Sequence, residues 1–145
     1  RGGLAALDGG VIATAPSAPL EDRLAEIHRA VDALLDEHRP DALALEELYF
    51  GQNARSALAV GQARGAVMSA AGLRGVRCSG YTPQQVKGSV CGSGAAGKEQ
   101  VARMVVALLA LDAERRPDHA TDALAVAICH LNSAPLARAM AVAAR

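Results

Sequence analysis

Carboxylates and one imidazole stand where structural elements are expected to begin or end. Glu46 closes a short apolar run, and Asp122 follows His119 by three residues at the start of an expected helix. Residues three apart on a helix project from one face within a turn. Carboxylates and an imidazole that converge from different elements would suit a Mg²⁺ or Mn²⁺ site for phosphodiester hydrolysis, because two such ions activate water and stabilise the leaving oxygen. The plainer interpretation of His119 is a helix cap or a surface residue.

A second histidine is a weaker candidate for the same site. His130 follows His119 by eleven residues, and a helix places it about 16 Å further along the axis. This distance excludes His130 from a metal bound by His119.

A glycine-rich loop suggests a different chemistry. Residues 92–99 read GSGAAGKE and match a nucleotide-binding P-loop as far as Lys98. The next position should be Ser or Thr to hold Mg²⁺, but it is Glu99, and residues 86–91 favour a helix where a strand is needed. The pattern therefore argues against an ATP or GTP hydrolase. It leaves a site for one phosphate of a nucleic-acid backbone, formed by loop amides and Lys98 at a helix N-terminus.

Charge is uneven along the chain. The 15 basic Lys and Arg residues balance the 15 acidic residues, for a formal net charge of zero. Residues 1–50, however, hold ten acidic and four basic side chains, and residues 51–104 hold one acidic and seven basic ones. A basic middle segment indicates a polyanionic partner, and solvated helix faces are the alternative explanation.

Composition narrows the class of protein. The 145 residues are 51% hydrophobic but only 2% aromatic, and 33 of them are Ala. The core must therefore come from small and aliphatic side chains, which favours close-packed helices. Disorder is excluded by the apolar content, and no apolar run is long enough to span a membrane. Three cysteines without a CxxC spacing suit a reducing compartment.

Helical and extended patterns alternate, which predicts an α/β fold in a single domain over 1–145. Helices are expected at 20–38, 53–71, 83–90, 98–111 and from about 118 to 131, followed by a helical tail at 133–145; strands are expected at 42–48 and 76–81, and a hairpin at 4–14. The small-residue face of the 53–71 helix is a candidate dimer surface.

Three stretches together resemble successive motifs of the RuvC family of Holliday-junction resolvases. They are LALEELYFGQNARSALAVGQARGAV at 43–67, YTPQQVKGSVCGSGAAGKEQV at 81–101 and HATDALAVAICH at 119–130, and their order and spacing match from about residue 4 to 136. The resemblance implies an RNase H-like fold with a mixed central sheet flanked by helices, and a homodimer that cuts paired strands at a four-way DNA junction. It also implies Mg²⁺ (or Mn²⁺), with two ions per site, a branch-migration helicase complex as partner, no membrane association, and a cytoplasmic, nucleoid-associated location.

The resemblance also implies roles for individual residues. Glu46 and Asp122 match the family's catalytic, metal-binding carboxylates, and His119 resembles the histidine-bearing branch, in which the imidazole acts on the metal or the attacking water. Asp118, the residue before His119, is out of register with this family position and is the weaker candidate. The family's DNA-contacting lysines match Lys87 and Lys98, and its aromatics near the junction centre match Tyr49 and Phe50, where bases can stack. For Phe50, packing in the core is an equal alternative.

One family motif is absent from the sequence. Members begin with a strand whose Asp-Pro-Gly motif supplies the first metal ligand, and no Asp-Pro-Gly occurs here. Asp8 cannot replace it, because it falls in the expected hairpin turn. We expect the natural protein to be longer at its N-terminus and the 145-residue chain to be nearly inactive, poorly stable, or both. The sequence thus favours a junction endonuclease, with a non-catalytic junction-binding protein as the alternative.

Overall fold

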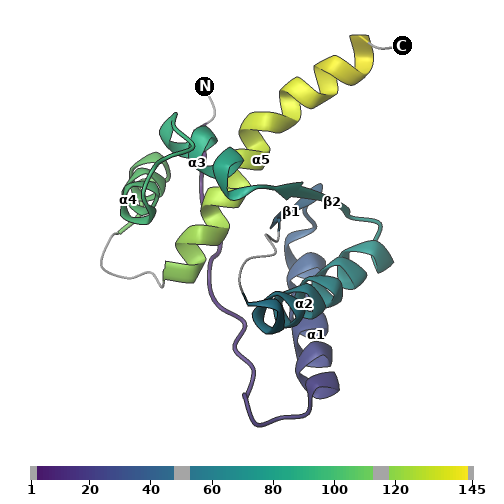
Figure 1. Ribbon diagram of the computed structural model, residues 1–145. Helices are drawn as coiled ribbons and strands as arrows, with labels where there is room; N and C mark the ends of the chain where they lie inside the picture. The colour runs from purple at the N-terminus through teal and green to yellow at the C-terminus, as the bar shows by residue number, and fades with distance from the viewer. Residues whose placement is uncertain (1–2, 48–52, 113–117, 144–145) are drawn as a thin grey trace. The chain divides into compact units, whose positions relative to one another are not determined.

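The computed structural model describes residues 3–47, 53–112 and 118–143. In these residues the elements follow the chain in the order shown in Figure 1: α1 (Leu20–His38), β1 (Ala42–Glu46), α2 (Ala54–Leu73), β2 (Arg77–Tyr81), α3 (Pro83–Cys91), α4 (Lys98–Leu108) and α5 (Asp118–Ala143). Each of them lies where the sequence pattern predicts an element of its type. The expected tail helix at 133–145 is the continuation of α5, which is a single helix as far as Ala143.

The ends of the helices follow from local chemistry. The Asn53 side chain accepts a hydrogen bond from the Ser56 amide at 3.3 Å and begins α2. This helix runs two residues beyond the end expected at residue 71, and the hydrogen bonds that end it are made by residues 75 and 76. The Gly75 amide donates to the Gly72 carbonyl and the Val76 amide to the Ala71 carbonyl, with Gly75 at a φ of +70°. This is a Schellman motif, whose left-handed residue is best filled by glycine.

The hairpin expected at residues 4–14 is wrong. Residues 3–19 contain no strand. Leu7 is 88% exposed and Val11 54%, whereas Leu4 is half-buried and packs against the buried cluster of the first unit. The Asp8 carboxylate instead accepts a hydrogen bond from the Gly9 amide at 2.7 Å, a contact between adjacent residues that needs no partner strand. An isolated two-stranded hairpin is marginal in water, so two short apolar runs around a glycine turn do not hold one together by themselves.

The described residues divide into two compact units. The first contains residues 3–11, 44–46, 80–112 and 118–143, and the second contains residues 12–43, 47 and 53–79. Strands β1 and β2 pair as a two-stranded sheet, and the division runs through both of them. Each unit has its own core, and the two are described separately.

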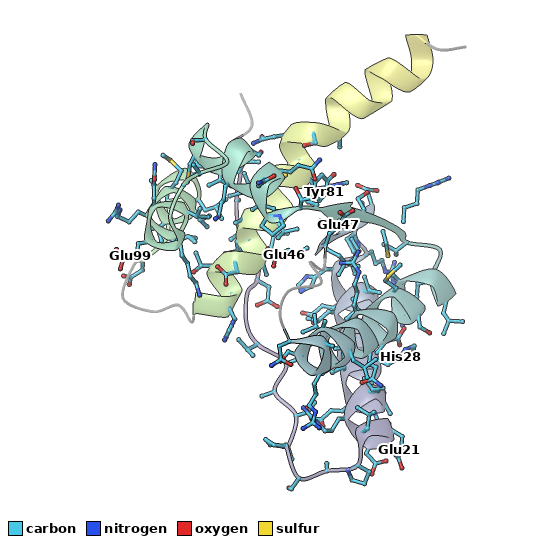
Figure 2. All side chains as sticks on the ribbon, viewed as in Figure 1. Glu21, His28, Glu46, Glu47, Tyr81 and Glu99 are labelled. Atoms are coloured by element: carbon cyan, nitrogen blue, oxygen red, sulfur yellow. The ribbon has the colours of Figure 1, made fainter. Side chains whose placement is uncertain are left out.

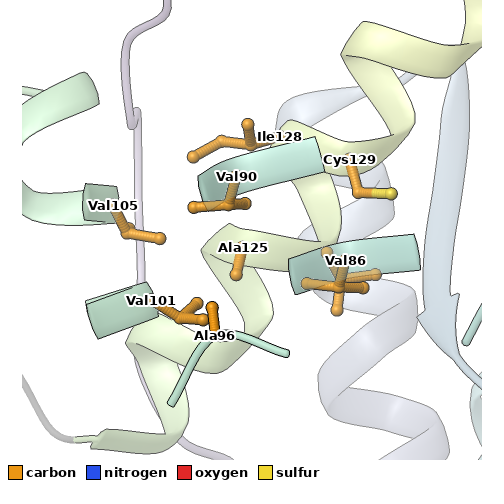
Figure 3. Packing of buried hydrophobic residues seen from close by; sticks show 9 residues of the cluster. Val86, Val90, Ala96, Val101, Val105, Ala125, Ile128 and Cys129 are labelled. Atoms are coloured by element: carbon orange, nitrogen blue, oxygen red, sulfur yellow. The ribbon is translucent and has the colours of Figure 1, made fainter. Parts of the chain in front are cut away.

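The first unit is built around α5, with α3 and α4 packed against it (Figure 1). Its buried cluster contains only aliphatic side chains and one thiol, as Figure 3 shows: Val86, Val90, Ala96, Val101, Val105, Ala125, Val126, Ile128 and Cys129. Small side chains let the three helices approach closely, as the low aromatic content predicts. This packing fixes α3 and α4 on α5.

The second unit is the pair of helices α1 and α2. Val31 and Leu35 of α1 are buried against Ala70 and Ala71 of α2. At the edge of this contact, Arg74 forms a two-pronged ion pair with the Asp32 carboxylate, with a further bond of 2.7 Å to Asp36. The hydrogen bond from Arg74 lowers the pKa of Asp32 and raises that of the guanidinium.

None of the described helices is both long enough and apolar enough to cross a membrane.

Candidate active site

A cavity of about 290 Å³ in the first unit collects most of the residues that the sequence singled out. Its lining comes from the end of β1 and from α3, α4 and α5: Glu46, Pro83, Val86, Lys87, Lys98, Val101, Asp122, Ala125 and Val126. The polar members are two carboxylates and two ammonium groups. The remaining five are apolar.

The two carboxylates reach the cavity from elements far apart in the sequence. Glu46 is the last residue of β1 and is exposed, and Figure 2 shows it where the strand ends beside α5. Asp122 lies in the second turn of α5, with a side chain that is 47% exposed. Both acids can therefore meet a ligand from solvent without being desolvated by the protein.

The two lysines stand on different helices of the same cavity. Lys98 is the first residue of α4, and its ammonium lies 3.8 Å from a carboxylate oxygen of Asp122. Because these side chains are 67% and 47% exposed, such a pair stabilises the fold by no more than about 1 kcal/mol. Lys87 is half-buried on α3. Two ammonium groups beside two carboxylates can hold a phosphodiester together with metal cations that neutralise it.

The remaining candidates from the sequence are His119 and two aromatic residues. His119 is exposed in the first turn of α5, one turn before Asp122, but it is not part of the cavity lining. Nowhere in the described residues do three His, Cys, Asp or Glu side chains gather closely enough to hold a metal ion. Tyr49 and Phe50 lie outside the described residues.

The donors present fit a hard divalent cation. Mg²⁺ is usually held by one or two carboxylates, and water and substrate phosphates complete its shell. Glu46 and Asp122 supply two such carboxylates on one cavity. The site thus suits a cation that binds together with a phosphate ligand more than one caged by protein alone.

The apolar lining was not singled out from the sequence, although a signal for it exists. Pro83 and Val86 are three residues apart on α3, and Asp122, Ala125 and Val126 are three and four apart on α5. This is the spacing of one helix face. Knowing that Asp122 belongs to a site would therefore have placed Ala125 and Val126 beside it.

His130, which the sequence excluded as a ligand, has another partner. Its Nδ1 lies 2.8 Å from the Tyr81 hydroxyl, and the two rings meet edge to face. Nothing in the sequence pattern indicated this pair, because the two residues are 49 positions apart.

The glycine loop does not have the structure of a nucleotide P-loop. Helix α3 precedes it, where a P-loop needs a strand. Gly92 ends this helix with a φ of +75°, and Gly97 stands before the first residue of α4. The loop therefore joins two helices and sets Lys98 at the start of the second.

Comparisons with known proteins agree on one family. The model of the family "Crossover junction endodeoxyribonuclease RuvC" matches residues 1–130. The RuvC protein of Moorella thermoacetica is 50% identical over 113 residues, which are 78% of this chain and 68% of that protein. The one from Mycobacterium marinum is 45% identical over 140 residues, or 97% of this chain and 76% of the relative.

Solved structures agree with this likeness. Thermus thermophilus RuvC superposes with a TM-score of 0.86 at 42% identity, covering 94% of this chain and 84% of that one. The same protein in complex with a Holliday junction substrate superposes with a TM-score of 0.81 at 39% identity, covering 90% and 78%. The predicted α/β fold of the RNase H-like kind is thereby confirmed.

Proposed function

The chain belongs to the RuvC family of crossover junction endodeoxyribonucleases and is an endonuclease that resolves Holliday junctions, and we propose that it cuts at the cavity between Glu46 and Asp122. One observation carries the proposal. Two carboxylates and two lysines from four different elements line a single cavity. This combination holds a divalent cation and a phosphodiester side by side.

The lysines act on the DNA backbone. Lys98 approaches a phosphate from the start of α4, where helix amides also point outward. In the free protein its ammonium is beside Asp122, and the exposure of both side chains makes this contact easy to exchange for a phosphate. Lys87 contacts the backbone from α3. Neither lysine reads bases, so both contribute to affinity and register more than to sequence preference.

Glu46 and Asp122 are the cation ligands. The family is a nuclease family that needs a divalent metal, and the proposed ion is Mg²⁺, which Mn²⁺ can replace. When bound, it activates the attacking water and stabilises the leaving oxygen. The two carboxylates keep DNA phosphates at a distance until cations balance them, so close docking of the scissile phosphate depends on metal. A second ion would draw on His119, one turn before Asp122 on α5.

The remaining proposals rest on the family resemblance. His119, one turn before Asp122, acts on the metal or on the attacking water. Tyr49 and Phe50 follow the β1 strand in the sequence and stack on bases near the junction centre. The protein works as a homodimer, because two strands must be cut in a pair, and together with a branch-migration helicase. Its place of work is the cytoplasm, at the nucleoid.

The direct test is a cutting and binding assay on a labelled synthetic four-way junction. The chain and a version extended by a strand carrying Asp-Pro-Gly are compared on denaturing and native gels, with and without Mg²⁺. The expected result is symmetrical, Mg²⁺-dependent cutting by the extended protein and preference for the junction over duplex DNA by both. If neither protein cuts and both hold the junction, the proposed catalytic site is wrong and the non-catalytic alternative stands.

Matched substitutions test the individual residues. Lys87→Ala and Lys98→Ala are each expected to weaken junction binding and to lower its salt dependence, because each removes one phosphate contact. Arg103→Ala is the control, since Arg103 is an exposed cation on α4 that does not line the cavity. Equal losses from all three variants would mean that general positive charge, and not this cavity, binds the DNA.

A further inference from the structure

A tyrosine and a histidine outside the cavity connect the start of α3 to α5. The Tyr81 hydroxyl and the His130 Nδ1 are 2.8 Å apart, with ring centroids at 5.8 Å and ring planes at 72°. Both residues are half-buried. The pair is thus joined by a hydrogen bond and by an edge-to-face contact, an arrangement that aromatic rings favour.

Tyr81 stands directly before the helix that carries Lys87. It is the last residue of β2, and the next residue, Thr82, begins α3 with a capping box. In this box the Thr82 hydroxyl accepts from the Gln85 amide at 3.2 Å, and the Gln85 side chain accepts from the Thr82 amide at 2.8 Å. A tie on Tyr81 therefore fixes the point from which α3 starts, and the capping box fixes the direction that it takes.

A second polar tie holds the other end of α3. The Asn132 side-chain amide donates to the Ser89 hydroxyl at 3.1 Å. His130 and Asn132 are two residues apart on α5, so both ties end on the same stretch of that helix. Lys87 lies between the tied residues Tyr81 and Ser89, on a helix whose inner face is buried in the core.

The same helix α5 carries Asp122 of the candidate site. His130 is eight residues further along, which is about 12 Å on a helix axis. At that distance His130 does not touch a ligand in the cavity. It can, however, affect where Lys87 lies relative to Asp122, because hydrogen bonds hold both ends of α3 against α5.

We propose that Tyr81 and His130 are positioning residues that hold Lys87 at the rim of the cavity, where it contacts a phosphate of the junction. This inference rests on the proposed function of Lys87 as a DNA contact. Because α3 is tied at both ends, the backbone of Lys87 is held in one place relative to the cavity, and its half-buried side chain starts from that place. If α3 were not held, Lys87 would still be attracted to DNA, but it would contact several phosphates or water in turn and no single defined phosphate.

Three substitutions separate the hydrogen bond from the rings. Tyr81→Phe removes the hydroxyl and keeps the edge-to-face contact. His130→Leu removes the ring nitrogens and keeps the volume approximately. His130→Asn places an amide group near the position of Nδ1 and can again bond the hydroxyl. Leu131→Ala is the control, because Leu131 is the next residue on α5 and its side chain is 53% exposed.

The experiment measures binding of a fluorescent four-way junction to the 145-residue chain in EDTA over a range of salt concentrations, so it needs no cutting. Lys87→Ala is expected to lower the slope of log affinity against log salt by about 1. Tyr81→Phe and His130→Leu are expected to weaken binding about three- to tenfold, the worth of one hydrogen bond, and to lower the slope by part of that unit. His130→Asn recovers both values, and Leu131→Ala changes neither.

The decisive comparison is made in the Lys87→Ala background. There His130→Leu is expected to cause no further loss of affinity, since the residue that it positions is gone. A purely structural role would give the opposite pattern, with the same loss in both backgrounds, an unchanged slope and a lower melting temperature by circular dichroism. That result overturns the inference and leaves the role of Lys87 intact. If Lys87→Ala itself leaves the slope unchanged, the proposed function of Lys87 fails first and the inference fails with it.

Discussion

Replacing Asp122 with asparagine is expected to separate cutting from binding. The substitution removes a charge but leaves the shape of the side chain almost unchanged. It deletes one of the two carboxylates on the cavity and the partner of Lys98 at 3.8 Å. The loss of the ion pair affects junction binding, and the loss of the carboxylate affects cutting.

The effect on binding is bounded by the ion pair. Two unit charges at this distance attract by about 1 kcal/mol in a water-like dielectric, and both side chains are largely exposed. Asp122→Asn therefore costs little stability. It releases Lys98 for phosphate, so metal-free junction binding is expected to stay equal or to strengthen by at most about fivefold.

The effect on cutting is much larger. Loss of a residue that only supports a metal ligand typically costs about 10- to 100-fold, so loss of a ligand itself is expected to cost at least about 100-fold. The assay is single-turnover cutting of a labelled junction with Mg²⁺ by the extended protein, beside native gels in EDTA. Glu99→Gln removes an equal charge from the exposed first turn of α4, outside the cavity lining, and is expected to keep cutting.

Two results would refute this reasoning. If Asp122→Asn abolishes binding while the circular dichroism spectrum stays native, Asp122 is part of the DNA contact and not a cation ligand. If cutting falls less than about tenfold, the carboxylate is not needed for the chemistry.

The other predictions concern stability. Val105→Ala removes two methyl groups from a fully buried site, which costs about 1.6 kcal/mol of transfer free energy plus a cavity term, while the better helix propensity of Ala returns about 0.5 kcal/mol. Urea unfolding is expected to show a loss of about 1.5–2.5 kcal/mol in the free energy of unfolding. The control Leu73→Ala, at a residue that is 78% exposed, is expected to lose almost none. Asp32 has a lowered pKa because Arg74 donates a hydrogen bond to it, so the stability that this carboxylate contributes is present above its ordinary pKa of 3.8 and is lost as pH falls through the lower folded value. Asp32→Asn is therefore expected to lower the melting temperature near neutral pH and to have no effect in strong acid. A difference in melting temperature that persists in strong acid contradicts the assignment. Thr82→Ala is expected to cost about 1 kcal/mol in urea unfolding through loss of the α3 cap, and Thr82→Asp, which also caps, is expected to recover most of it.

Residue order and spacing predicted the described helices and both strands of this fold, and the resemblance of three motifs to one family named the candidate site residues. The Thr82-Pro83 pair begins α3, Asn53 begins α2, and apolar spacing places every described helix and both strands. These features are local, because a cap or a helical face depends on residues within a few positions. The family resemblance of the motifs around Glu46 and Asp122 also named the nuclease activity, and the roles of these two residues stay a prediction.

Other features depended on contacts that no local pattern contains. Two short apolar runs at 4–7 and 11–14, separated by Asp8-Gly9-Gly10, predicted a hairpin, but a strand needs a neighbour to pair with, and none of the described residues provides one there. The ion pair of Lys98 with Asp122 and the hydrogen bond of Tyr81 with His130 join residues 24 and 49 positions apart. Such pairs exist only after the helices have packed on α5. The sequence by itself therefore determined which groups are available and on which element each one stands. Tertiary packing alone decided which of them meet, because distance in space between separate elements is set by the core and not by spacing along the chain.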